Sequence, residues 1–154
     1  GTIFDIYFPI EQPQQETPHK EVIEALSTKG GDEVILLIED EDALAGLVHN
    51  ALAKLGYNIL LASDGEEAIE LYKEHNEYIA AVISDIGLPK FDGEEVYMHI
   101  KAINNEVKVI FASGYIEPEM KERLMKNGAK HFIQKPYLMN EVQWALRQII
   151  DEGK

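Results

Sequence analysis

Cysteine is absent from the 154 residues of the sequence. Disulfide bonds, thiolate metal ligands and cysteine nucleophiles are therefore excluded. The sequence also lacks any apolar run close to the roughly 18 residues that a membrane-spanning helix requires, and no segment has the pattern of a signal peptide. We therefore expect a cytoplasmic protein that makes no direct contact with a membrane.

Positively charged residues are scarce. Lysine and arginine together number 14 against 28 aspartates and glutamates, so the formal net charge is −14 at pH 7. Nucleic acids are bound by clustered Lys and Arg, so we expect no nucleic-acid partner. Apolar residues still make up 45% of the chain, which suffices for the core of one domain with some extra length. The first residue is not methionine, and we expect a fragment of a longer protein.

The composition changes at Gly30-Gly31. Residues 1–10 are mostly apolar, and residues 11–31 are rich in Gln, Glu and Pro. Prolines at positions 9, 13 and 18 fix the backbone and remove hydrogen-bond donors, which is typical of a linker. We therefore expect a linker over residues 11–31 and a folded domain over residues 32–154.

Beyond residue 31, five apolar segments of strand length alternate with five segments whose apolar residues have helical spacing. The expected strands are residues 34–38, 57–61, 80–83, 107–111 and 131–133, and the expected helices are residues 42–55, a segment that begins after Ser63-Asp64, and residues 94–103, 118–127 and 139–150. This alternation predicts an α/β fold, with a parallel sheet covered by helices on both faces. In such sheets, ligands bind beyond the carboxyl ends of the strands, where the strand order reverses.

Chemically reactive side chains follow four of the five predicted strands. Glu39-Asp40 follow the first strand and Asp85 the third, while Ser113 and Lys135 follow the fourth and fifth. An acidic residue after a strand is often a helix cap, and a lone Ser or Lys there is often a loop residue. The joint occurrence of these residues at one edge of the sheet favours a functional site instead.

The side chains of this predicted site indicate its chemistry. Three carboxylates held close together repel one another, which raises the pKa of at least one of them unless a cation binds. No Cys or His falls at a strand end, so the oxygen ligands favour Mg²⁺ or Mn²⁺. A carboxylate that remains free can act as a nucleophile toward a phosphoryl group. The Lys135 ammonium and the Ser113 hydroxyl can neutralise charge on the moving phosphoryl oxygens.

Four segments resemble the receiver domain of response regulators and hybrid histidine kinases. They are residues 34–41, 82–93, 109–115 and 131–136, which read VILLIEDE, VISDIGLPKFDG, VIFASGY and HFIQKP. The resemblance covers about residues 32–152 and implies a flavodoxin-like, doubly wound (βα)5 receiver fold with a parallel five-stranded sheet of order 2-1-3-4-5. It also implies phosphorelay signalling in a two-component system.

The same resemblance implies the acceptor and the metal ligands. Asp85 would take a phosphoryl group from the phosphohistidine of a histidine kinase or of a His-containing phosphotransfer protein. Glu39, Asp40 and Asp85 would bind the metal, together with the backbone carbonyl of Gly87. Glu39 departs from the family pattern, in which Asp is commoner, so a water molecule could complete its reach to the metal.

The resemblance further implies three residues that respond to phosphorylation. Lys135 would pair with the phosphoryl group. Ser113 would be the switch hydroxyl, and Phe132 would be the aromatic residue that moves inward on activation.

Residues 1–10 carry a second resemblance, to the closing strand of the ATP-binding domain of histidine kinases. With the linker, it implies that the chain is the C-terminal receiver of a hybrid sensor histidine kinase. Separated from its own sheet, this segment would be an unpaired strand. We expect it either to lack fixed structure or to pair with a neighbouring molecule, as would occur in a homodimer.

A Mg²⁺-dependent phosphohydrolase with an aspartyl nucleophile is the main alternative. Such enzymes have a second Asp two residues after the nucleophile as the general acid, whereas Asp85 is followed by Ile86-Gly87. We therefore expect phosphotransfer to the domain itself and slow autodephosphorylation, but no turnover of external phosphoesters.

Two other functions have weaker support. A flavodoxin-like nucleotide-binding module would need a Gly-rich or hydroxyl-rich loop after the first strand, and residues 39–42 are all acidic. A phosphotransfer histidine is weakly suggested by His49 with Lys54 and Gly56, but His49 is more typical of a helix surface.

Overall fold

The computed structural model describes residues 30–89 and 91–152. The strand predicted at residues 1–10 and nearly all of the predicted linker lie outside the described residues. In chain order, the elements are β1 (Val34–Ile38), α2 (Asp42–Ala53), β2 (Asn58–Ala62), α3 (Gly65–His75), β3 (Ile79–Asp85), α4 (Gly93–Ile103), β4 (Val109–Ser113), α5 (Pro118–Lys126), β5 (His131–Gln134) and α6 (Met139–Asp151). Within these described ranges, we find no helix with the length and apolar character needed to cross a membrane.

The five strands form one parallel sheet with the order β2-β1-β3-β4-β5. The predicted fold class and strand order are therefore confirmed. β1 lies between β2 and β3, where Leu36 is in register with Leu60 on one side and Val82 on the other. The chain extends the sheet in one direction with β2 and in the other direction with β3, β4 and β5. The strand order thus reverses between β1 and β3, where ligands of such sheets bind.

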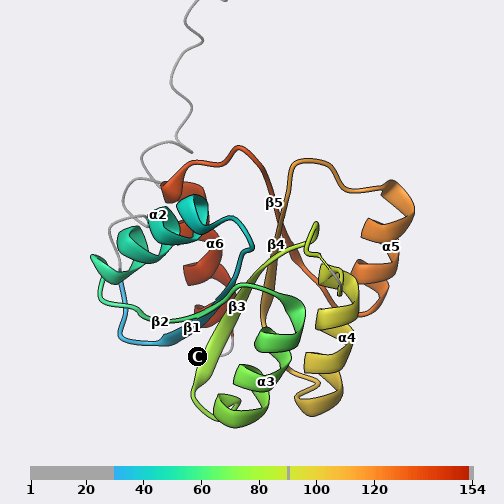
Figure 1. Cartoon of the computed structure of the whole chain (residues 1–154), viewed down its shortest axis with the longest axis horizontal. Helices are drawn as coiled ribbons and strands as arrows, with labels where there is room; N and C mark the ends of the chain where they lie inside the picture. Colours follow the sequence, from blue (N-terminus) through green and yellow to red (C-terminus); the bar gives the residue numbers. More distant parts are fainter. Residues whose placement is uncertain (1–29, 90, 153–154) are drawn as a thin grey trace, which may run out of the picture.

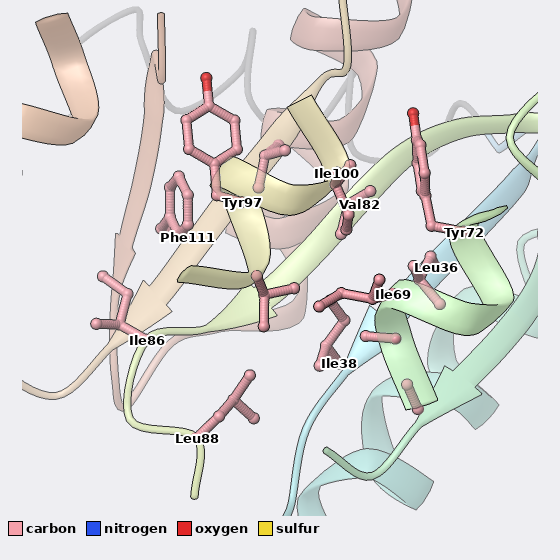
Figure 2. Close-up of a cluster of buried hydrophobic side chains, with 14 of the residues drawn as sticks. Leu36, Ile38, Ile69, Tyr72, Val82, Ile86, Leu88, Tyr97, Ile100 and Phe111 are labelled. Atoms are coloured by element: carbon pink, nitrogen blue, oxygen red, sulfur yellow. The ribbon is translucent and has the colours of Figure 1, made fainter. Parts of the chain in front are cut away.

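Helices cover both faces of the sheet, with α2 and α6 on one face and α3, α4 and α5 on the other (Figure 1). Successive side chains of a strand point to opposite faces, so Ile35 and Leu37 of β1 join the core with α2 and α6, whereas Leu36 and Ile38 join the other core. All four are at most 1% exposed. Figure 2 shows the second core, in which side chains of α3 and α4 pack on the central strands. Burial on both faces explains the continuous apolar sequence of β1.

Two strands have ends that differ from the expectation by two residues, and the ends of the other strands differ by at most one. The third strand continues beyond residue 83 to Asp85, because its last residues pair with β4, with Asp85 opposite Ala112. The fourth strand begins at Val109, because the Val107 N–H donates to the Asn104 carbonyl (3.2 Å) in the turn after α4. Asp85 therefore belongs to the sheet, which restricts its backbone.

A buried ion pair lies near the amino end of β1. The Arg147 Nη2 atom of α6 donates to Glu33 Oε1 at 2.8 Å, and Arg147 is only 4% exposed. The guanidinium carbon lies 5.4 Å from the centroid of the Tyr57 ring, and Nη1 lies 4.0 Å from Asp151 Oδ1. A charge buried to this extent requires such partners. The pair therefore connects α6 to the start of β1.

His131, at the start of β5, is half-buried, and burial lowers the pKa of its imidazole below the ordinary value of 6.5. Glu152 opposes this effect and Lys130 adds to it. Because folding lowers the pKa of His131, the folded state binds the proton less readily than the unfolded state does. The protein therefore has its full stability above the unfolded pKa and loses part of it as the pH falls through the folded pKa. We expect the substitution His131→Gln to reduce the loss of stability as the pH falls below about 6.5. Urea unfolding at each pH measures this, and identical pH dependence in the two proteins would contradict it.

Candidate functional site

Three carboxylates meet at the carboxyl edge of the sheet, where β1 and β3 are neighbours. Glu39 and Asp40 directly follow β1, and Asp85 is the last residue of β3. One carboxylate oxygen from each residue lies within 4.8 Å of the other two. Glu39 is only 4% exposed, whereas Asp85 is half-buried and Asp40 is exposed. In the part of the chain that the structure describes, no other group of three or more acidic, His or Cys side chains has this spacing.

Lys135, directly after β5, reaches the same carboxylates. Its Nζ atom lies 2.7 Å from Asp85 Oδ2 and 2.8 Å from Glu39 Oε2. The backbone supports this reach, because the Lys135 N–H donates to the Ser113 carbonyl at 2.8 Å. Burial alone would lower the pKa of Lys135, but the hydrogen bonds to Asp85 and Glu39, and their negative charges, outweigh burial and raise it. The ammonium therefore stays charged at neutral pH.

The pKa of the Glu39 carboxyl lies above its ordinary value. Burial raises the pKa of Glu39, the hydrogen bond from Lys135 lowers it only in part, and the charge of Asp85 raises it again. Three carboxylates thus face one ammonium, and a further cation would reduce the remaining repulsion. All the available ligand atoms of Glu39, Asp40 and Asp85 are oxygens, so the residues fit a hard divalent ion such as Mg²⁺ or Mn²⁺.

Backbone contacts fix the position of Asp85. The Gly87 N–H donates to Asp85 Oδ1 at 2.9 Å, and the Ile86 N–H donates to the Ala112 carbonyl at 3.1 Å. These bonds hold the carboxylate between the neighbouring strand and its own loop. The predicted role of the Gly87 carbonyl as a metal ligand stays a prediction.

Ser113 and Phe132 lie beside this group and not within it. The Ser113 hydroxyl donates to the carbonyl of Tyr115 at 2.5 Å, at the start of the loop after β4. The Phe132 ring stacks on Phe111 with centroids 5.6 Å apart, and Lys121 Nζ lies 5.3 Å from the Phe132 centroid. Ser113, Phe132 and Lys121 together line a pocket of about 310 Å³. The predicted switch hydroxyl and the aromatic residue predicted to move therefore border the same open volume.

Two residues that support Asp85 received no role from the sequence. Ser84 Oγ donates to the Asp85 carbonyl at 2.9 Å. The Gly93 N–H donates to the Ile86 carbonyl at 3.0 Å, and a Cβ atom on Gly93 would lie 2.6 Å from the Asp85 carbonyl oxygen. Only glycine allows α4 to begin so close to β3. Two features of the sequence could have indicated these roles. Ser84 is a polar residue in an apolar strand, and Gly93 directly follows Asp92, the N-cap of α4.

The sequence model of the response regulator receiver domain family matches residues 35–147. The chain belongs to this family. The family relationship agrees with the strand order and with an acidic group at the carboxyl edge of the receiver sheet. It does not favour the alternative of a phosphohydrolase.

Three proteins illustrate the similarity of this receiver domain to known proteins. The sensor kinase CckA of Brucella abortus is 27% identical over 158 residues, which cover 99% of this chain and 17% of the kinase. The chemotaxis protein CheY of Bacillus subtilis is 30% identical over 118 residues, which cover 76% of this chain and 97% of CheY. The crystal structure of the receiver domain of sensor histidine kinase PA1611 from Pseudomonas aeruginosa has a TM-score of 0.70 and 25% identity, and covers 79% of this chain and 99% of that domain. The chain spans less than half the length of several curated relatives that it matches.

Proposed function

We propose that this receiver domain accepts a phosphoryl group from a phosphohistidine on Asp85 and changes conformation in response. The observation that supports this role most directly is the contact of Asp85 Oδ2 with Lys135 Nζ at 2.7 Å, beside Glu39 and Asp40. The Lys135 ammonium lies against the Asp85 carboxylate, whose oxygen is the proposed nucleophile. The Asp85 side chain is 13% exposed, so a phosphoryl donor can approach it from the carboxyl edge of the sheet.

The transfer exchanges one bond to phosphorus for another. An Asp85 carboxylate oxygen forms a bond to phosphorus while the phosphorus–nitrogen bond of the phosphohistidine breaks. The histidine nitrogen keeps the electron pair of that bond, and the imidazole leaves in its neutral form when its other nitrogen carries a proton. Lys135 then pairs with the new negative charge. The Ser113 hydroxyl can donate to a phosphoryl oxygen once it leaves the Tyr115 carbonyl.

Glu39, Asp40, Asp85 and the Gly87 carbonyl are the proposed ligands of Mg²⁺ or Mn²⁺. Support comes from the all-oxygen ligand set and from the similar Pseudomonas aeruginosa receiver domain, whose structure has a magnesium ion coordinated in the active-site cleft. When bound, the ion supplies positive charge that neutralises the oxygens of the transferring phosphoryl group.

Labelling with acetyl phosphate and Mg²⁺ tests the proposed function. We expect the intact protein to gain one phosphoryl group by mass spectrometry, and EDTA to prevent the gain. A generic phosphatase substrate, p-nitrophenyl phosphate, should not be turned over. Absence of labelling would contradict the receiver function, and sustained hydrolysis of the phosphatase substrate would favour the phosphohydrolase alternative.

The substitution Lys135→Ala should separate metal binding from signalling. Removal of the ammonium takes a positive charge away from Glu39 and Asp85, so we expect Mg²⁺ affinity to stay the same or to increase. The conformational response to the phosphoryl mimic beryllofluoride should be lost, because no ammonium pairs with the phosphoryl oxygens. Calorimetric Mg²⁺ titration and amide NMR spectra measure the two effects. A Lys135→Ala protein with a normal beryllofluoride response would exclude the proposed role.

We also propose that the chain is the C-terminal receiver of a hybrid sensor histidine kinase and acts in the cytoplasm, where ATP supplies the phosphoryl group. Support comes from the similarity to sensor kinase CckA, which extends over 99% of this chain and so includes most of residues 1–31. The proposed donor is the phosphohistidine of the parent kinase or of a His-containing phosphotransfer protein. Residues 1–10 are proposed to be the end of the kinase ATP-binding domain and residues 11–31 the linker.

A further inference from the structure

Among the helices in the described part of the chain, α5 has the fewest buried residues. Leu124 is the single buried residue among its nine, whereas α2, α3, α4 and α6 each have three or more. A helix with so little apolar burial opens locally at low free energy. Polar contacts therefore have unusual weight in holding α5 in place.

One side of α4 provides most of these polar contacts. Glu94, Tyr97 and Lys101 are spaced by three and four residues, so they lie on the same side of the helix. Arg123 of α5 donates to Glu94 through both Nε and Nη2, at 3.0 and 2.7 Å. The Tyr97 hydroxyl donates to the Asn127 carbonyl at 2.8 Å, and Lys101 Nζ donates to the same carbonyl. α4 thus holds α5 at two levels. The upper contact is at Arg123, and the lower contact is at Asn127, one helical turn later.

The two levels differ in strength. The lower contact, at Asn127, involves the buried Tyr97 and is followed by Gly128 in the left-handed backbone region, with a φ of 97°. The upper contact is an ion pair whose Arg123 and Glu94 side chains are 53% and 19% exposed. Water and salt weaken exposed ion pairs. The upper contact should therefore open first, while the Asn127 level acts as a pivot.

The upper contact is also linked to the site. Glu94 directly follows Gly93, which packs against the Asp85 carbonyl. On the other side of α5, Lys121 Nζ lies over the Phe132 ring. A shift of the loop after Asp85 would move Glu94, and a shift of Phe132 would remove the contact of Lys121. α5 is thus held on one side by Glu94, which is next to the loop after Asp85, and on the other side by Phe132, which is predicted to move on activation.

We propose that the Arg123–Glu94 ion pair, one helical turn before Asn127, is a latch that holds α5 against α4 in the unphosphorylated protein. Its opening lets α5 turn about the Asn127 level and uncovers the side of α5 that faces α4. The latch itself is a property of the resting protein, whereas its regulation by Asp85 rests on the proposed function.

Hydrogen exchange of the α5 amides tests the latch in the unphosphorylated protein. We expect Glu94→Gln and Arg123→Gln each to accelerate exchange in α5 by about 2- to 5-fold, as expected from loss of one exposed ion pair. The double variant should exchange no faster than either single variant, because both remove the same contact. Glu122→Gln is the matched control, since it removes an acid of α5 whose one ion pair within the described ranges is with Lys126 of the same helix, at 3.9 Å.

Unchanged α5 exchange in Glu94→Gln, or additive effects in the double variant, would overturn the latch. The same variants are then treated with acetyl phosphate. Glu94→Gln should be labelled like the unmodified protein, because Glu94 lies outside the carboxylate group. A lack of labelling in the unmodified protein would contradict the proposed function, whereas normal labelling with unchanged α5 exchange would contradict the latch alone.

Discussion

The substitution Asp85→Asn is expected to reduce labelling by acetyl phosphate or by a phosphohistidine donor by about 10³-fold or more, to background. An amide is a poor nucleophile, and it also removes one of the three carboxylate charges near Lys135. The fold should persist, because Asn has the same shape and the Gly87 N–H can still donate to its side-chain oxygen. Intact-mass measurement after incubation with the donor gives the labelled fraction.

Asp64→Asn is the matched control for this substitution. Asp64 accepts a hydrogen bond from the Glu67 N–H at the start of α3, it lies outside the carboxylate group, and Asn caps helices as well as Asp does. Its labelling should equal that of the unmodified protein. Undiminished labelling of Asp85→Asn would show that another residue accepts the phosphoryl group.

The substitution Glu33→Gln is expected to lower the free energy of unfolding by about 3 kcal/mol. Arg147, 4% exposed, would keep its buried charge without its 2.8 Å carboxylate partner. The Tyr57 ring and Asp151, at 5.4 and 4.0 Å, compensate only in part. Urea unfolding measures the change, which should appear as a lower midpoint with an unchanged slope.

Two further variants make the Glu33 prediction specific. Glu33→Gln combined with Arg147→Met should be more stable than Glu33→Gln alone, because the double variant no longer buries an incompletely paired charge. Glu122→Gln, at an exposed pair, should leave the free energy of unfolding nearly unchanged. A Glu33→Gln protein as stable as the unmodified one would contradict the prediction.

Much of the fold could be predicted because apolar segments of strand length alternate regularly with segments of helical spacing along the sequence. The continuous apolar sequence of β1 indicates burial on both faces, and the structure places Leu36 and Leu37 in opposite cores. Topology alone then brings distant residues together, since parallel strands present their carboxyl ends at one edge. Lys135 and Glu39 are 96 positions apart in sequence and 2.8 Å apart at their charged atoms.

Long-range polar pairing was not predictable from periodicity. Val142, Leu146 and Ile150 have the spacing of one apolar side of a helix, whereas nothing in the sequence gives a reason to bury Arg147. Its burial depends on Glu33, which is 114 positions away in sequence. The hydrogen bond from Ser113 to the Tyr115 carbonyl and the ion pair of Arg123 with Glu94 likewise depend on side-chain geometry. Family resemblance names a switch hydroxyl but does not indicate its resting partner.

Chemical trapping of the phosphorylated residue tests the central proposal most directly. Borohydride reduces an aspartyl phosphate to an alcohol, so peptide mass spectrometry after phosphorylation and reduction identifies the acceptor. We expect the reduced residue at position 85, in the peptide that contains Ser84 and Ile86. A reduced residue at Asp40 or at any other position, or a stable phosphate on Ser113, would contradict the account.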